Sequence, residues 1–311
     1  MQRPQSTLMT KKKLFIIGNG FDVYHGINSR YHDFRKYLES RDRDLCEKLK
    51  EYFNYDNLWS DFEQSLADFD AYYLIENAED FLVPYSADKW SDAYHHDYQN
   101  EISEVVEALS HTLKSRFTSW VLQLENPSSA NRKRLSYIDA SALFLTFNYT
   151  QTLQRIYAIP DKNVLHIHGK AEDELSNLIL GHAWKPSDRV ALSGHVDLDV
   201  EDPRVTEGNQ MIDKYFKLTY KPTSKIIKNN TSFFQSLTSV EEIYVLGHSI
   251  AKVDIEYFRQ IMISINLKST KWHVSHYGKD ELNRHVATMQ TLGMKPNMVH
   301  FFDLKNIAAN K

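Results

Sequence analysis

The most informative segment of the chain reads Leu14-Phe-Ile-Ile-Gly-Asn-Gly-Phe-Asp22. Four apolar residues run directly into Gly18-Asn19-Gly20, and a carboxylate, Asp22, follows. Glycines lack a Cβ, so they adopt backbone angles closed to other residues and allow a ligand to approach the main chain. A helix that begins at once would direct its N-terminal N–H groups toward an anion. The segment therefore predicts a first parallel strand that ends in a phosphate-binding turn, where a valine at Gly20 should obstruct a pyrophosphate while the fold survives.

This turn departs from the usual dinucleotide-binding fingerprint. Val23 stands where the third glycine is expected, and no acidic residue ends a second strand about twenty residues later. Glu39 lies near that distance, but within a helical pattern. A tight turn that binds no ligand is therefore the alternative interpretation.

The composition is that of an ordinary soluble globular protein, with 42% hydrophobic and 25% charged residues among 311. A net charge of −4 argues against a general nucleic-acid surface. The single cysteine, Cys46, excludes an intramolecular disulfide and a Cys-rich zinc site. No apolar run approaches the roughly 20 residues of a membrane span, and the N-terminus lacks a signal-peptide core. We therefore expect a cytoplasmic protein without a membrane partner.

Helical and strand patterns alternate along most of the chain. Helical spacing marks residues 30–38, 57–69, 93–124, 254–263 and 280–292. Strand-like apolar runs mark residues 142–147, 164–168, 178–180, 243–246 and 272–275. Near-continuous apolar strands suit a sheet that is covered on both faces. The patterns predict an α/β, Rossmann-like fold with a mostly parallel sheet and helices on both faces.

We expect one domain over residues 1–311. Residues 41–135 form a helical insertion in this prediction, because strand signals are missing there. Residues 185–205 are polar and contain Gly194 and two prolines, so we expect a mobile loop or lid.

Polar residues follow five of the predicted strands. These groups are Gly18–Asp22, Thr146–Thr150, His166–Gly169, Gly181–His182 and Gly247–Ser249. In open parallel sheets, ligands bind beyond the carboxyl ends of the strands. The five groups therefore predict a ligand site at one edge of the sheet.

Several of these residues also have a purely structural interpretation. Asn148 suits the cap of a helix that starts near Thr150, and Asp254 suits an N-cap. His166 and His168 alternate with one residue between them, so both should project from the same strand face. Of the two, His166 lies deeper in the predicted strand and is the better candidate for a hydrogen-bonded core residue. Polar loop or strand-end roles are the alternative for His25, His182 and His248.

Five motifs follow one another in a specific order. They are Gly18-Asn-Gly-Phe-Asp-Val-Tyr-His-Gly26, Trp59-x-Asp-Phe-Glu63, Phe147-Asn-Tyr-Thr-x-Thr152, His166-x-His-Gly169, and Gly247-His-Ser249 followed by Asp254. In order and spacing these motifs resemble the AbiH family of bacterial abortive-infection proteins. The resemblance spans most of the chain and implies an antiphage abortive-infection effector.

The same order is distantly similar to the sirtuin-type NAD-binding fold. There a Gly-Ala-Gly-x-Ser turn ends in Gly-Ile, as Gly26-Ile27 does here. The similarity implies that Asn148 matches the asparagine of that family, His168 the histidine of its His-Gly motif, and Ser249 the serine near the adenosine ribose.

Departures from that pattern narrow the implied activity. Asp22 replaces the serine of the first turn, and Thr150 replaces an aspartate. The four-cysteine zinc module of deacylating sirtuins cannot exist with one cysteine, so the similarity implies NAD hydrolysis rather than protein deacylation. NAD would be the substrate, and the implied binding residues are Gly18, Asn19, Gly20, Phe21, Tyr149, Gly169, Gly247, His248, Ser249 and Asp254.

The chemistry of NAD cleavage is compatible with these residues. Nicotinamide leaves as a neutral pyridine, so the site must stabilise an oxocarbenium-like ribose, position a water and supply a base. We expect Asn148 to orient water or ribose hydroxyls, His168 to accept a proton, and Asp22 to favour the positive ribose centre.

Two other functions compete with this hypothesis. A metal-dependent phosphoesterase or nuclease could use His166 and His168 as ligands, although no acidic pair accompanies them and no metal is expected. A nucleotide-sensing module without catalysis is the third candidate. The expected partner is a small nucleotide, without general nucleic-acid binding. The sequence identifies neither the phage trigger nor the oligomeric state, and a homo-oligomer is compatible with it.

Overall fold

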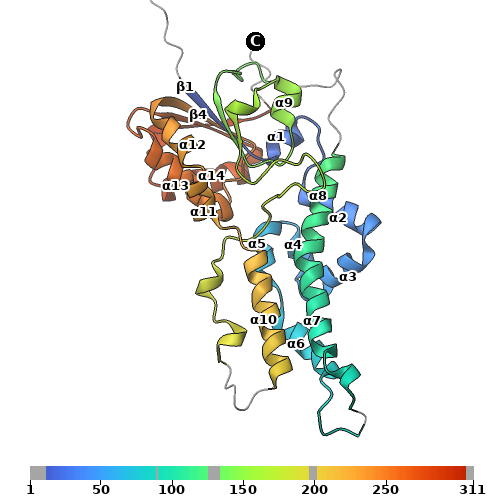
Figure 1. The fold of residues 1–311 in the computed structure, drawn as a ribbon. Helices are drawn as coiled ribbons and strands as arrows, with labels where there is room; N and C mark the ends of the chain where they lie inside the picture. The colour runs from blue at the N-terminus through green and yellow to red at the C-terminus, as the bar shows by residue number, and fades with distance from the viewer. Residues whose placement is uncertain (1–11, 89, 125–133, 196–201, 306–311) are drawn as a thin grey trace, which may run out of the picture. The chain divides into compact units, whose positions relative to one another are not determined.

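The computed structural model describes residues 12–88, 90–124, 134–195 and 202–305. The chain divides into two compact units, whose elements are coloured in chain order in Figure 1. Unit 1 comprises Met1–Asn28, Leu124–Lys170 and Thr223–Lys311, and unit 2 comprises Ser29–Gln123 and Ala171–Pro222. Most of the predicted helical insertion, up to Gln123, lies in unit 2, which also contains residues 171–222.

Unit 1 is built on a parallel sheet, which confirms the predicted α/β, Rossmann-like class. The sheet contains, in the described residues, β1 (Lys12–Ile17), β2 (Leu143–Thr146), β3 (Val164–His166), β4 (Val240–Leu246), β5 (Lys271–His276) and β6 (Val299–Asp303). The strand order is β3-β2-β1-β4-β5-β6, and every neighbouring pair is parallel. The order reverses between β1 and β4, as in doubly wound dinucleotide-binding folds.

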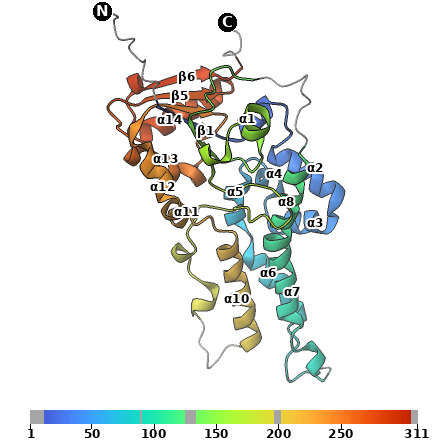
Figure 2. The same cartoon turned by 45° about the horizontal axis from the view of Figure 1, so that its top comes forward.

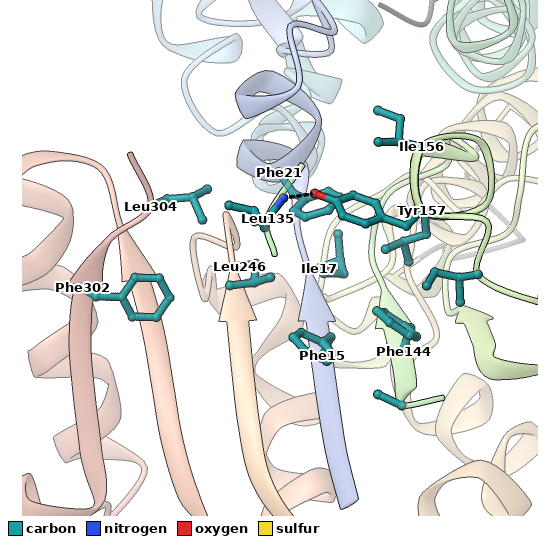
Figure 3. Packing of buried hydrophobic residues seen from close by; sticks show 13 residues of the cluster. Phe15, Ile17, Phe21, Leu135, Phe144, Ile156, Tyr157, Leu246, Phe302 and Leu304 are labelled. Atoms are coloured by element: carbon teal, nitrogen blue, oxygen red, sulfur yellow. Dashed lines mark hydrogen bonds between the residues drawn. The ribbon is translucent and has the colours of Figure 1, made fainter. Parts of the chain in front are cut away.

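Apolar residues cover both faces of this sheet. Along β1, Phe15 and Ile17 belong to a buried cluster that includes Phe21 and Ile156 (Figure 3). Successive side chains of a strand point to opposite faces, so the fully buried Ile16 packs on the other side. The helices of unit 1 are α1 (Asn19–Tyr24), α9 (Thr152–Tyr157), α11 (Thr223–Asn229), α12 (Thr231–Gln235), α13 (Ile255–Ser264) and α14 (Gly278–Thr291), and Figure 2 shows them with the sheet in a second view.

One predicted strand is absent from the structure, and one observed strand was not predicted. Residues 178–180 form no strand, although Leu178 and Leu180 are buried. Strand β6 was not predicted, because His300 interrupts its short apolar pattern. A run of three apolar residues suits any buried segment, and only the neighbouring strand decides whether it pairs.

Unit 2 is helical. Its helices are α2 (Tyr31–Arg41), α3 (Arg43–Tyr52), α4 (Tyr55–Leu58), α5 (Phe62–Ser65), α6 (Ala71–Ala78), α7 (Asp97–Glu107), α8 (Leu113–Gln123) and α10 (Pro203–Leu218). A π-helical turn over Ala108–Thr112 joins α7 to α8, so the predicted long helix is nearly continuous. The helix predicted over 57–69 is instead broken into short pieces.

The predicted loop 185–205 contains regular structure at both ends. Short 3₁₀ turns span Pro186–Asp188 and Leu192–His195, and residues 196–201 lie outside the described residues. Helix α10 then begins at Pro203, because the Asp202 side chain accepts the Arg204 N–H and proline suits the first helical position.

The motif Trp59-x-Asp-Phe-Glu63 packs inside unit 2. The rings of Trp59 and Phe62 stack with centroids 5.1 Å apart. Glu63 forms an ion pair with Lys221, which is fully buried, and accepts a 2.6 Å hydrogen bond from the Tyr31 hydroxyl. Because a buried ammonium needs a compensating charge, Glu63 stabilises unit 2.

Across the described ranges, no helix is long and apolar enough to cross a membrane.

A hydrogen-bond chain beside the core of unit 1 gives a matched pair of variants. The Tyr157 hydroxyl accepts the Leu135 N–H at 2.8 Å (Figure 3) and donates to His25 Nε2 at 2.8 Å. Tyr157→Phe removes the hydroxyl that pairs with the Leu135 N–H and His25 Nε2, so we expect the free energy of unfolding to fall by about 1–3 kcal/mol in denaturant titrations. The Tyr137 hydroxyl is buried without a partner among the described residues, so Tyr137→Phe should be neutral or stabilising. Equal losses in both variants would contradict this assignment.

Candidate functional site

The turns that follow β1 and β4 touch each other through their backbones. The Gly20 N–H donates to the Gly247 carbonyl at 2.7 Å, and the Gly18 N–H donates to the Leu246 carbonyl at 3.0 Å. A Cβ at Gly20 would lie 2.9 Å from the Gly247 Cα, and one at Gly18 would lie 2.5 Å from the His248 Cα. These glycines are therefore required by packing as well as by any ligand. A valine at Gly20 should disturb the fold itself, contrary to the expectation from sequence.

The β4 turn is strained and firmly held. Gly247 has φ +63°, and Ile250, a β-branched residue, has φ +51° in the left-handed region. The Ile250 N–H donates to His248 Nδ1 at 2.8 Å, and the Gly247 N–H donates to Ser275 Oγ at 2.8 Å. Such strain persists only where surrounding contacts determine the conformation, and it is common at functional sites.

The end of β2 is tied to the β1 turn by two side chains. Asn148 Nδ2 donates to the Gly18 carbonyl at 3.1 Å, and Thr150 Oγ1 donates to Asp22 Oδ2 at 2.6 Å. Helix α9 begins at Thr152 with Gln151 as its N-cap. Asn148 is therefore not a helix cap, and the structure brings it together with Gly18 as the sequence predicted.

Asp22 is a buried carboxylate with an unsatisfied oxygen. Its exposed fraction is 1%, and Oδ1 has no hydrogen-bond partner among the described residues. Burial raises the pKa of Asp22 to about 6, although the hydrogen bond from Thr150 opposes this shift. The residue is thus mostly ionised at neutral pH, inside the fold and next to the glycine turn. A perturbed buried carboxylate at a strand end is a candidate functional group.

His166 and His168 have different surroundings, contrary to the prediction of one shared face. Strand β3 ends at His166, whose Nδ1–H donates to the Asn148 carbonyl at 3.1 Å, and whose Nε2 accepts from Gln154 Nε2 at 3.0 Å. His168 lies in the following turn and is only 2% exposed, whereas His166 is half-buried. The prediction that His166 is the more buried residue was wrong, because alternation stops where the strand ends.

The side chains of His168 and His248 both lie close to the carboxylate of Asp254. His168 Nε2 lies 3.2 Å from the Tyr257 hydroxyl and 3.7 Å from Asp254 Oδ1. His248 Nε2 lies 3.6 Å from Asp254 Oδ2. Asp254 occupies the N-cap position of α13, but its side chain makes no capping hydrogen bond. Sequence reasoning missed Tyr257, although its position three residues after Asp254 places both on one side of a helical turn.

The structure also places the other residues that the sequence assigned to the ligand site or to its surroundings. The Phe21 side chain lies in the hydrophobic core, so its backbone is the part that faces the turn. The ring nitrogens of His25 both make hydrogen bonds, to the Phe21 carbonyl and to Tyr157. Asn19 and Ser249 are exposed, whereas Tyr149 is buried, with its ring centroid 6.4 Å from that of His168. Gly169 has φ +94°.

His182 belongs to unit 2 and not to the strand ends of the sheet. It pairs with Tyr220 in an isolated parallel bridge, and burial lowers its pKa to about 4. The predicted group at Gly181–His182 is therefore not one of the strand ends in this sheet. Within the described ranges, no three His, Cys, Asp or Glu side chains form a group that could hold a metal ion.

The fold and the site together define a doubly wound α/β protein with a polar site at the point where the strand order reverses. The family model described as bacteriophage abortive infection AbiH matches residues 14–276, and the chain belongs to this family. Membership supports a role in phage abortive infection. No match to the chain was found among curated proteins or among solved structures.

The buried carboxyl of Asp22 gives a pH-dependent prediction. Because its pKa is about 6 in the fold and 3.8 ordinarily, the folded state binds an extra proton between these values. The contribution of that proton to stability is present below about pH 4 and is lost as the pH rises through about 6. The Asp22→Asn variant has no carboxyl group to titrate, so it does not lose this contribution. The difference in unfolding free energy between the variant and the wild type should therefore change in favour of the variant by on the order of 3 kcal/mol between about pH 4 and 7.

Urea titrations at several pH values measure this difference. Thr150→Val is the control, because it removes a hydrogen bond to Asp22 but keeps the carboxyl group. This control should show a pH dependence at least as large as that of the wild type, because the lost hydrogen bond opposes the rise of the Asp22 pKa. A stability difference between Asp22→Asn and wild type that does not change with pH would contradict the assignment.

Proposed function

We propose that the carboxyl ends of β1 and β4 in unit 1 form a site that binds NAD and hydrolyses it to nicotinamide and ADP-ribose. The observation that carries this proposal is the strand order, β3-β2-β1-β4-β5-β6, with the glycine turns of β1 and β4 in backbone contact at the reversal. In this topology a dinucleotide lies across the crevice at the reversal, with its pyrophosphate over the first glycine turn. Helix α1 has only six residues, so the glycine backbone matters more here than a helix dipole.

For this reaction, the site has to stabilise positive charge on the ribose more than it has to supply a general acid. Water adds to the ribose C1′ as the C1′–N bond breaks, nicotinamide leaves neutral, and one proton is released. Positive charge develops on the ribose in the transition state, and a fixed negative charge in a site of low polarity stabilises it strongly. Asp22 supplies that charge in this proposal, since it is buried and has an oxygen without a partner among the described residues.

In this proposal Asn148 positions the reacting groups, and His168 acts as the general base. The hydrogen bond to the Gly18 carbonyl fixes the amide of Asn148 beside the turn, where it can orient a ribose hydroxyl or the attacking water. His168 accepts the proton that the water loses. His166 has another role, because its two ring nitrogens are engaged by the Asn148 carbonyl and Gln154. Because both ring nitrogens of His166 make hydrogen bonds within the protein, these contacts disfavour a metal site formed by His166 and His168 together.

Replacement of single residues tests the proposal. Asn148→Ala and His168→Ala should each lower NAD cleavage by about 10²-fold or more, because positioning and general-base roles commonly have this size. The double variant should be scarcely slower than either single variant, since residues that act as a unit are not additive. His166→Ala should mainly lower the melting temperature. Nicotinamide release, measured by mass spectrometry alongside thermal melts, separates these effects.

Controls distinguish the competing functions. Extended dialysis against a chelator should leave turnover unchanged, and loss of turnover with rescue by a divalent ion would favour the phosphoesterase alternative. NAD binding without product would favour the nucleotide-sensing alternative. A folded and fully active Asn148→Ala protein would contradict the proposed mechanism.

A further inference from the structure

The carboxylate of Asp254 faces two buried histidines that come from different strand ends. His168 follows β3 and His248 follows β4, and their Nε2 atoms lie 3.7 and 3.6 Å from the two oxygens of Asp254. We propose that Asp254 is a positioning residue: it orients both imidazoles and stabilises the protonated form of His168, while His248 stays neutral. This inference deepens the proposed function and rests on it for the catalytic role of His168.

The proton arrangement of His248 follows from its contacts. The Ile250 N–H donates to His248 Nδ1 at 2.8 Å, so Nδ1 must present its lone pair. The ring proton of neutral His248 is then on Nε2, the atom nearest to Asp254. Protonation of Nδ1 would break the bond to Ile250, whose strained backbone depends on the contacts of this turn. Neutral His248 therefore carries its ring proton on the side that faces Asp254, and it is not the base.

His168 is in a different position. Its Nε2 lies within hydrogen-bond distance of the Tyr257 hydroxyl, and the Asp254 carboxylate is 3.7 Å away, so a ring proton on Nε2 faces a hydrogen-bond partner and a negative charge. Among the described residues, the titratable groups that face it include Asp254 and Tyr257 on the α13 side, His248 from the β4 turn, and Tyr149 from the β2 turn. Asp254 is the carboxylate of this set. A nearby opposite charge favours the protonated imidazole, so Asp254 supports proton uptake when water attacks.

An aromatic ring holds this arrangement together. The Phe147 ring lies 4.2 Å from the His248 ring, 5.3 Å from the His168 ring and 5.4 Å from the Tyr257 ring, centroid to centroid. All four residues are buried at the edge of the sheet. Side chains packed in this way keep their rotamers, which makes the distances to Asp254 a property of the fold.

Nitrogen-15 NMR of the histidine rings in the full chain tests the proposal without relying on turnover. In the wild type, His248 should keep its proton on Nε2 and stay neutral over about pH 5 to 8, while His168 takes up a proton in that range. Asp254→Asn preserves size and removes the charge, so the midpoint of His168 should fall by about one pH unit. Asp303→Asn, at the end of β6, is the matched control and should leave that midpoint unchanged.

The outcomes separate this inference from the proposed function. A His248 proton on Nδ1 in the wild type would overturn the inference even if the Asp254 variant fails to fold. An unchanged midpoint of His168 in Asp254→Asn would overturn it as well. If the NMR results are as expected but the wild type does not cleave NAD, the positioning role stands and the proposed function fails. If NAD is cleaved, Asp254→Asn should lower kcat about tenfold or more with little change in KM.

Discussion

The backbone contact between the β1 and β4 turns is the constraint on which the rest of the site depends. Gly20 and Gly247 approach so closely that neither position has room for a side chain. This contact brings the ends of the two central strands together at the point where the strand order reverses. The neighbouring strand ends then attach to it: Asn148 bonds to the Gly18 carbonyl, and the backbone of His248 lies against Gly18. A polar edge is thus assembled from segments up to 230 residues apart.

Several features of this edge oppose stability locally. Asp22 is buried with an oxygen that lacks a partner among the described residues, and Ile250 occupies a left-handed backbone conformation. Burying a charge without full compensation and straining a backbone both raise the free energy of the folded state. The apolar sheet below, with Phe15 and Ile17 packed in its core, offsets these terms. Violations of local rules that gather in one place are typical of functional sites.

The sequence predicted the fold class well, because the apolar strands and the Gly18–Asp22 turn are local signals. It could not predict that β3 ends at His166, since pairing with β2 determines that boundary. The burial of His168 follows from this boundary and was therefore missed. The sequence placed Asn148 and Gly18 at one edge of the sheet, but local spacing could not predict the direct hydrogen bond between these residues, which lie 130 positions apart. Gly18 and Gly20 have a packing role that a motif alone cannot distinguish from ligand binding.

The most direct test of the account is a crystal structure of the protein with a non-hydrolysable carbocyclic NAD analogue. We predict the pyrophosphate over the turns of Gly18 and Gly247, and the nicotinamide ribose within reach of Asp22, Asn148 and His168. Such a complex would establish that the reversal of the strand order is the nucleotide site. An analogue bound at another place in the molecule, with this edge unchanged, would contradict the central claim.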